Sequence, residues 1–183
     1  MSENKRPFNE RPIAITDIET TGTDPRVHEI IEIGLVLVDQ PTLNVISTYE
    51  VKIKPEHLEL AQPRALEVNG YKEADWRGAL TLKAALESYA ALTHEAAFLA
   101  HSVTFDWPFM EEGFRKTGVT QTMDRHRLCN MTLAWGLLRQ KGLVHVNQKE
   151  VAQFLGIEPE PDVHRAINGA MLAYRILRKL SGL

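Results

Sequence analysis

The chain has 183 residues, of which 44% are hydrophobic and 25% are charged, and these values are typical of one globular domain. They exclude a disordered chain, a collagen or a coiled coil as the main architecture. The single cysteine, Cys129, excludes an intramolecular disulfide framework. The formal net charge of −3 argues against a broad basic surface for binding nucleic acid.

The first ten residues are polar, and we expect them to form a flexible tail ahead of a single domain at residues 11–183. They contain no apolar core of a signal peptide. No apolar segment approaches the roughly 20 residues that a membrane span requires. We therefore expect a cytoplasmic protein with no membrane partner.

Strands are predicted first along the chain. Residues 13–18 and 30–38 are short β-branched runs, and the residues from 20 to 25 between them are dense in turn formers. Residues 45–53 alternate between apolar and polar side chains, after a turn at 39–44 that contains a proline. This pattern indicates three antiparallel strands.

The rest of the chain is mainly helical in pattern. Residues 96–100 read as a short buried strand. Apolar residues at helical spacing predict helices over residues 79–92, 105–116, 128–139, 147–155 and 166–180. Strands followed by mixed elements and then helices predict an α/β domain with a mixed sheet and flanking helices.

Two carboxylates stand near the end of the first predicted strand. Asp17 and Glu19 are two residues apart, and the strand period of two places their side chains on the same face. Like charges at the edge of a core are costly unless they share a cation. Oxygen ligands of this kind favour Mg²⁺ or Mn²⁺. The alternative is a solvated strand end with two surface acids.

The residues that follow suit the end of a substrate. Gly22 lets the backbone approach a ligand closely, and exposed amides near Thr20 and Thr21 could hold a sugar hydroxyl or a phosphate. A simple turn is the alternative.

Two later segments carry further candidate groups. Asp106 follows the predicted strand at 96–100, where it is either a helix N-cap or a third carboxylate beside Asp17. His164 stands on a loop that precedes the last predicted helix. It is either an ordinary surface histidine or a proton acceptor near neutral pH.

These segments, in this order, resemble the DEDDh branch of the DEDD 3′–5′ exonuclease superfamily. That superfamily has a ribonuclease H-like fold and includes polymerase proofreading subunits and ribonuclease T-like enzymes. The resemblance covers about residues 11–181. The matching positions are Asp17, Glu19, Thr20 and Gly22 in the first motif, His101, Phe105 and Asp106 in the second, and His164 in the third.

Three departures accompany the resemblance. Ser102 replaces the asparagine usual in the second motif, and the turn from Val68 to Tyr71 is similar to the family's substrate-side turn, with Asn69 in place of histidine. The third motif is broken, because Gly169 stands where the family carries its fourth acidic ligand. Asn168 and Asp162 are nearby, but Asn168 is rotated about 100° away on a regular helix and Asp162 lies on the wrong side of His164.

The resemblance implies the following roles. Two divalent cations, Mg²⁺ or Mn²⁺, would clamp the scissile phosphate at the 3′ end of single-stranded DNA or RNA. Asp17 would bind both ions, Glu19 the ion that carries the attacking water, and Asp106 the second ion. His164 would accept the proton of that water, and the backbone near Thr20 and Thr21 would fix the terminal sugar. With Gly169 at the fourth position, one cation site and the activity are expected to be weakened.

Two other functions stay open at the sequence level. One is a catalytically silent nucleic-acid-binding or scaffold domain of the same fold, and the other is a metal-dependent phosphoesterase with a non-nucleotide substrate. The oligomeric state, whether monomer, homodimer or polymerase-associated subunit, also stays open. The acidic composition does not count against a nucleic-acid substrate, because Asp17, Glu19 and Asp106 alone contribute a charge equal to the net charge of −3.

Overall fold

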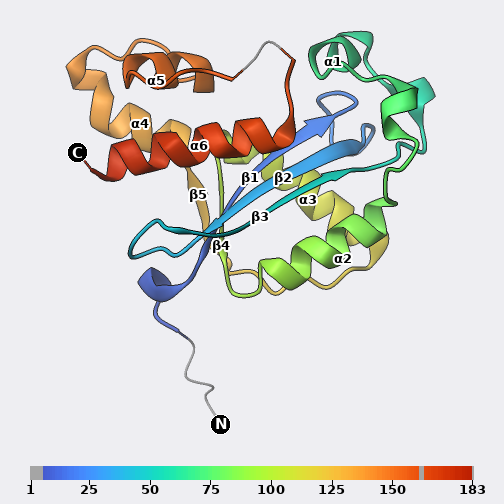
Figure 1. Cartoon of the computed structure of the whole chain (residues 1–183), viewed down its shortest axis with the longest axis horizontal. Helices are drawn as coiled ribbons and strands as arrows, with labels where there is room; N and C mark the ends of the chain where they lie inside the picture. The colour runs from blue at the N-terminus through green and yellow to red at the C-terminus, as the bar shows by residue number, and fades with distance from the viewer. Residues whose placement is uncertain (1–5, 161–162, 183) are drawn as a thin grey trace.

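A computed structural model describes residues 6–160 and 163–182 and shows a five-stranded mixed sheet. The strands are β1 (Ile13–Thr20), β2 (Ile30–Val38), β3 (Val45–Lys52), β4 (Ala97–Ala100) and β5 (Arg127–Cys129). Their order in the sheet is β3-β2-β1-β4-β5. The first three strands are antiparallel, and β4 and β5 run parallel to β1 (Figure 1). The predicted α/β fold with a mixed sheet is confirmed.

Helices cover both faces of this sheet (Figure 1). They are α1 (Pro63–Val68), α2 (Leu82–Leu92), α3 (Val103–Thr117), α4 (Asn130–Leu138), α5 (Gln148–Phe154) and α6 (Ala166–Ser181). Helix α6 lies along β1 and β2 on one face, with α4 and α5 packed against it, and α2 and α3 cover the other face. None of the helices described combines the length and hydropathy needed to cross a bilayer.

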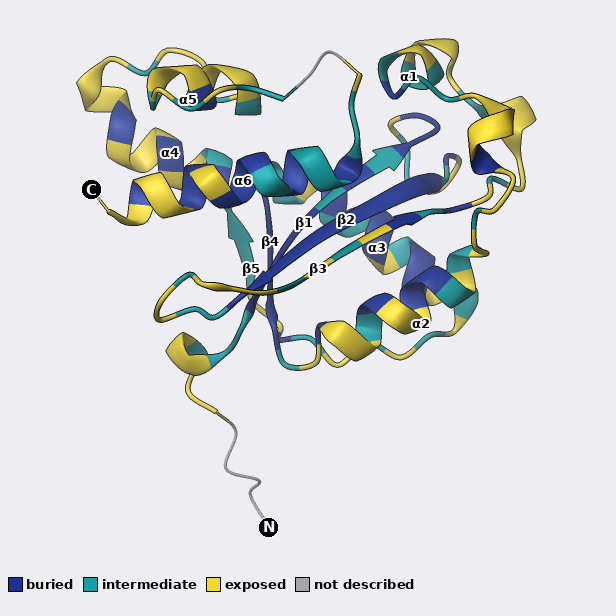
Figure 2. Ribbon diagram, in the orientation of Figure 1, coloured by how far each residue is buried: buried dark blue, intermediate teal, exposed yellow. Residues whose placement is uncertain are grey.

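The alternation of β1 divides its side chains between two cores. Ile13 and Ile15 are buried against α6, whereas Ala14 and Ile18 join the core under α2 and α3. The buried strands lie at the centre of the molecule in Figure 2. Because side chains alternate, Asp17 falls on the same face of β1 as Ile13 and Ile15, which is the face that α6 covers.

Most predicted elements are confirmed, with small shifts at their ends. Strand β2 has the predicted bounds, and the Asn147 side chain caps α5 by accepting a hydrogen bond from the Glu150 amide at 3.0 Å. One prediction was wrong. Residues 128 and 129, predicted as the start of a helix over 128–139, belong to the edge strand β5, because this strand pairs with β4. The short helix α1 was not foreseen, since its six residues are too few for a periodic pattern.

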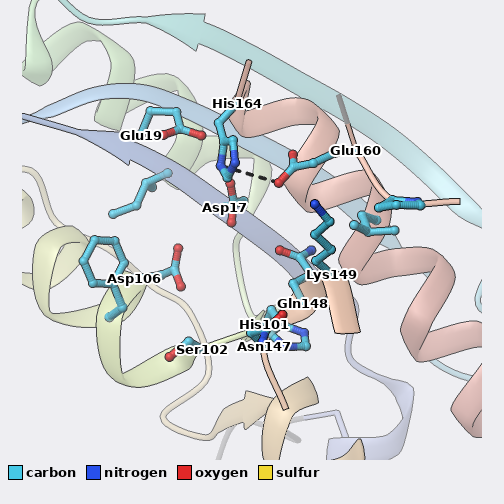
Figure 3. A pocket seen from close by; sticks show the side chains of 14 residues that line it. Asp17, Glu19, His101, Ser102, Asp106, Asn147, Gln148, Lys149, Glu160 and His164 are labelled. Atoms are coloured by element: carbon cyan, nitrogen blue, oxygen red, sulfur yellow. Dashed lines mark ion pairs between the residues drawn. The ribbon is translucent and has the colours of Figure 1, made fainter. Parts of the chain in front are cut away.

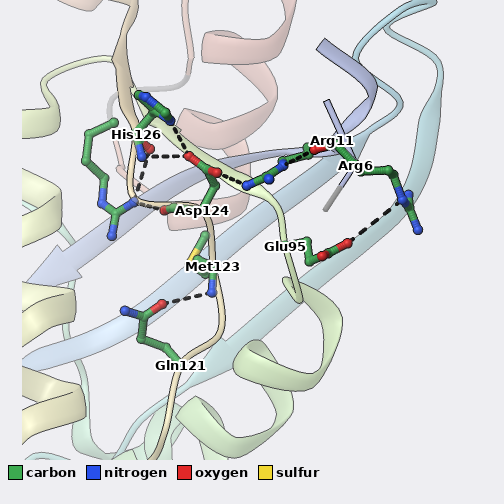
Figure 4. Close-up of polar contacts among 8 residues, drawn as sticks. Arg6, Arg11, Glu95, Gln121, Met123, Asp124 and His126 are labelled. Atoms are coloured by element: carbon green, nitrogen blue, oxygen red, sulfur yellow. Dashed lines mark hydrogen bonds and ion pairs between the residues drawn. The ribbon is translucent and has the colours of Figure 1, made fainter. Parts of the chain in front are cut away.

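The start of the chain also differs from the expected tail. Residues 8–10 form a 3₁₀ turn, and the Phe8 ring packs edge-on against His126 at 4.9 Å between centroids. Arg11 pairs with the buried carboxylate of Asp124 (Figure 4). Residues 1–5 lie outside the described part of the chain.

The close approach of α6 to the sheet depends on Gly34. A Cβ atom at this position in β2 would lie 2.2 Å from the carbonyl carbon of Ala166, at the first turn of α6. Since backbone cannot move aside as a flexible side chain can, a larger residue would push α6 away from the sheet.

Gly34→Ala is therefore expected to lower the free energy of unfolding by about 1–3 kcal/mol, the usual cost of overpacking. Chemical denaturation followed by circular dichroism measures this loss. Gly136→Ala is the matched control, because nothing lies within 4 Å of a Cβ at that exposed position in α4. Equal stability of the two variants would contradict the packing argument.

Candidate active site

Six of the predicted site residues line one cavity of about 580 Å³ between β1, the start of α3 and the loop before α6. The other predicted residues, Thr20, Thr21, Gly22 and Val68, are not among its lining residues. Its lining includes the predicted residues Asp17, Glu19, His101, Phe105, Asp106 and His164. Figure 3 shows their arrangement. Residues that are more than 140 positions apart in the sequence therefore share one site.

Asp17 lies near the end of β1 and faces helix α6. The Cβ of a larger residue at position 169 would lie 2.4 Å from Asp17 Oδ2. Position 169 therefore points at the Asp17 carboxylate, as the spacing of the third motif implies. Gly169 supplies no ligand there, and the Asp17 carboxylate fills the space that a side chain would take.

Asp106 enters the site from α3 and is 4% exposed. It is not an N-cap, because α3 begins at Val103 and its cap residue is Ser102. The helix starts earlier than predicted, which places Asp106 at its fourth position. This correction removes the structural alternative for Asp106 and leaves its carboxylate directed into the cavity.

Burial raises the pKa of all three carboxyls, and repulsion from neighbouring carboxylates adds to this for Asp17 and Glu19. Burial is the main cause for Asp17, whose pKa lies well above its usual value, with Asp106 and Glu19 adding repulsion. Burial and the charge of Glu32 raise the pKa of Glu19 to about 8. Burial raises the pKa of Asp106 to about 7, against the effect of backbone amide hydrogen bonds. In the described residues, none of the three forms an ion pair with a basic side chain that would offset this cost.

His164 is held over the cavity by backbone and by a carboxylate. Its amide donates to the carbonyl oxygen of Val68 at 3.3 Å, and its Nδ1 lies 3.5 Å from Glu160 Oε1. The imidazole is 44% exposed, so it can exchange protons with solvent. Val68 thus takes part through its backbone carbonyl, which anchors the histidine.

The Thr20–Gly22 segment is more enclosed than the sequence suggested. Thr20 and Thr21 are buried, the Thr20 hydroxyl donates to the Gly22 carbonyl at 2.7 Å, and the Thr21 amide donates to Glu29 at 2.9 Å. The Thr21 amide is therefore not exposed for a ligand. A Cβ at Gly22 would lie 2.3 Å from the His28 ring, so glycine is required there for packing.

His101 and Phe105 form the opposite wall of the cavity. His101 Nε2 is bonded to the carbonyl of Val146 at 2.8 Å, and its buried Nδ1 has no protein partner among the described residues. Burial lowers the pKa of His101, which favours the neutral ring. Phe105 packs against Phe109 with 5.2 Å between ring centroids.

Several lining residues were not foreseen as functional. Glu160 stands on the loop before His164, and the first turn of α5 adds Gln148 and Lys149. A carboxylate four residues before the motif histidine was the available signal for Glu160. Of the two nearby groups weighed against Gly169, Asn168 lines a different hollow with Arg175, and Asp162 lies outside the described residues.

The donor set fits a divalent cation in its chemistry. Oxygen ligands from Asp17, Glu19 and Asp106 suit Mg²⁺ or Mn²⁺, and burial with some repulsion from neighbouring carboxylates raises the pKa of Asp17 and Glu19. As placed in the described residues, however, no three His, Cys, Asp or Glu side chains form a closed metal-binding group. The carboxylates share one cavity without converging on one point.

The chain matches the family model described as an exonuclease over residues 14–177. It therefore belongs to this exonuclease family, within the DEDD superfamily of 3′–5′ exonucleases.

Individual relatives agree with the family assignment. The chain is 26% identical to a PolC-type DNA polymerase III of Thermotoga petrophila over 92% of its length, and this match spans only 12% of that polymerase. Its fold resembles E. coli exonuclease I in complex with a dT13 oligonucleotide (TM-score 0.78, 20% identity, 93% of this chain and 40% of the other). It also resembles a 3′-exonuclease that recognises the histone mRNA stem-loop (TM-score 0.76, 18% identity, 97% and 67%).

The raised pKa of Glu19 predicts how stability depends on pH. Because its folded pKa of about 8 exceeds the usual 4.5, its stabilising contribution is complete below about pH 4.5 and is lost as the pH rises through 8. In EDTA, the unfolding temperature of the wild type should fall from pH 5.5 to pH 8.5 by several degrees more than that of Glu19→Gln.

Thermal unfolding followed at the two pH values measures this difference, and adding Mn²⁺ at pH 8.5 should raise the wild-type unfolding temperature. Glu87→Gln, an exposed carboxylate on α2, is the control and should follow the wild type. A wild type and Glu19→Gln with parallel pH profiles would show that Glu19 is not held at raised pKa.

Proposed function

We propose that this chain is a metal-dependent 3′–5′ exonuclease of the DEDDh type, which hydrolyses nucleoside monophosphates from the 3′ ends of single-stranded DNA or RNA. The observation that carries the proposal is the shared cavity of Asp17, Glu19, Asp106 and His164, built from three distant parts of an exonuclease-family chain. Two bound Mg²⁺ or Mn²⁺ ions would polarise the phosphate and lower the pKa of the attacking water.

Each side chain has a role that follows from its position. Asp17, on the central strand, would hold both cations, while Glu19 and Asp106 would each complete one cation site. His164, whose side chain is 44% exposed, would accept the proton of the attacking water, because an imidazole is suited to act as a general base. Its hydrogen bond to the Val68 carbonyl fixes the loop beside the cavity.

The substrate end would be bound by the walls of the cavity. Phe105 provides an aromatic surface suited to a terminal base, and Lys149, which also lines the cavity, provides a cation for a phosphate. The likeness to exonuclease I with dT13 and to a histone mRNA 3′-exonuclease supports a single-stranded 3′ end. The PolC-type relative supports association with a polymerase.

The missing acid at Gly169 supports a second candidate function. A chain without its fourth ligand could bind nucleic acid without hydrolysing it. That alternative predicts no hydrolysis by the wild type and a gain of hydrolysis in Gly169→Asp. The retention of three carboxylates and a histidine in one cavity favours the enzyme.

The test is digestion of 5′-labelled single-stranded DNA and RNA with Mg²⁺ or Mn²⁺, in which loss of nucleotides from the 3′ end shortens the labelled strand. We expect stepwise shortening from the 3′ end, abolished by EDTA and reduced in kcat/KM at least about 100-fold by Asp17→Asn, beyond the 10–100-fold typical of groups that only support a ligand. Glu87→Gln should cleave like the wild type. Binding without cleavage by the wild type would favour the silent domain, and cleavage of other phosphate esters instead would favour a phosphoesterase.

A further inference from the structure

The described part of α6 offers no carboxylate to the site, yet the cavity contains a fourth one. Glu160 lines the same cavity as Asp17, Glu19 and Asp106. It comes from the loop between α5 and α6, whereas the family's fourth acid would come from position 169 inside α6. The acid that is absent at position 169 and the Glu160 side chain that is present in the cavity are both carboxylates.

The surroundings of Glu160 are those of an interior group. Its side chain is only 16% exposed, and its one ion pair among the described residues is with His164, at 3.5 Å. In Figure 3 its carboxylate points into the cavity beside His164. A solvated surface glutamate would extend away from three other carboxylates, so this placement needs a reason.

Electrostatics place Glu160 close to the two acids of the first motif. Its negative charge contributes to the raised pKa of both Asp17 and Glu19. Four carboxylates in one enclosed space are unfavourable without a positive partner. Lys149 and the half-exposed imidazole of His164 also line the cavity, and they offset part of that cost.

Position 169 faces the Asp17 carboxylate, whose Oδ2 lies 2.4 Å from the ideal Cβ position of Gly169. Gly169 supplies no ligand there. Glu160 reaches the same cavity from the loop between α5 and α6.

We propose that Glu160 supplies the fourth carboxylate of the site, binding a divalent cation together with Asp17 in place of the acid absent at Gly169. This inference rests on the proposed function. A rival role is that Glu160 only orients His164, which the 3.5 Å contact also allows. The two roles differ in what they do to metal binding.

The experiment measures Mn²⁺ binding by isothermal titration calorimetry and by electron paramagnetic resonance, without substrate. Glu160→Gln keeps the size of the side chain and removes its charge. It should weaken Mn²⁺ binding by at least about 10-fold or lower the number of bound ions. Glu158→Gln is the matched control, because Glu158 is an exposed carboxylate on the same loop and does not line this cavity.

A double variant tests whether a carboxylate at position 169 can replace the one at position 160 in binding Mn²⁺. Glu160→Gln combined with Gly169→Asp should regain Mn²⁺ affinity, since the clash at position 169 involves only the movable end of Asp17. The unfolding temperature in EDTA shows whether each variant is folded, and loss of one repelling charge should not lower it in Glu160→Gln.

The outcomes separate the two proposals. If the wild type binds Mn²⁺ and degrades oligonucleotides while Glu160→Gln binds Mn²⁺ equally well, the metal-binding role of Glu160 is overturned and the exonuclease stands. Unchanged Mn²⁺ binding with a shifted pH–rate profile would assign Glu160 to orienting His164. A wild type that neither binds Mn²⁺ nor degrades any oligonucleotide would overturn both.

Discussion

The contact between the first turn of α6 and strand β2 is the constraint on which the site depends. The buried carboxylate of Glu32 on β2 accepts a hydrogen bond from the Ala166 amide at 3.2 Å, and Arg165 lies 3.8 Å from the same carboxylate. An anion at the N-terminus of a helix is favourable, because the first amides have no partner within the helix. Gly34 leaves the space that this contact requires.

The same contact fixes the position of His164, two residues before the helix. It also brings position 169 against Asp17, which pairs with Gly34 across β1 and β2.

The site combines residues on rigid secondary structure with residues on a loop. Asp17 and Glu19 belong to a strand paired on both sides over part of its length, and Asp106 belongs to a long helix packed on the sheet. Their positions are fixed by the core, so the cost of their repulsion is carried by the packing around them. His164 and Glu160 belong to the loop between α5 and α6, held by the Val68 carbonyl and by their mutual contact. Three carboxylates of the cavity thus stand on the rigid scaffold, whereas Glu160 and the more exposed His164 stand on a loop.

The sequence predicted the parts of this arrangement that depend on local patterns. The two-residue period of a strand predicted that Asp17 and Glu19 lie on one face of β1. The resemblance predicted a site position five residues after His164, and position 169 does lie against Asp17. The order of three motifs predicted that they meet in one cavity.

The features that could not be predicted from the sequence depend on tertiary contacts. The edge strand β5 forms because β4 offers it a partner, and three residues carry too little pattern to reveal this. The closed Thr21 amide depends on its bond to Glu29 across a loop, and the entry of Glu160 into the cavity depends on the path of a loop containing two prolines.

The distribution of charge bears on how such a site handles a polyanion. The three carboxylates Asp17, Glu19 and Asp106 alone account for a charge equal to the formal net charge of −3, so the charges of the rest of the chain sum to zero. A balanced surface gives no long-range attraction along a nucleic-acid strand, and phosphate contacts away from the site would contribute little counterion release. Under the proposed function, affinity would come from groups close to the cavity, such as Phe105 and Lys149, and from cations that the carboxylates would hold. This arrangement favours engagement of a strand end over a grip on a long segment, which agrees with removal of nucleotides one at a time.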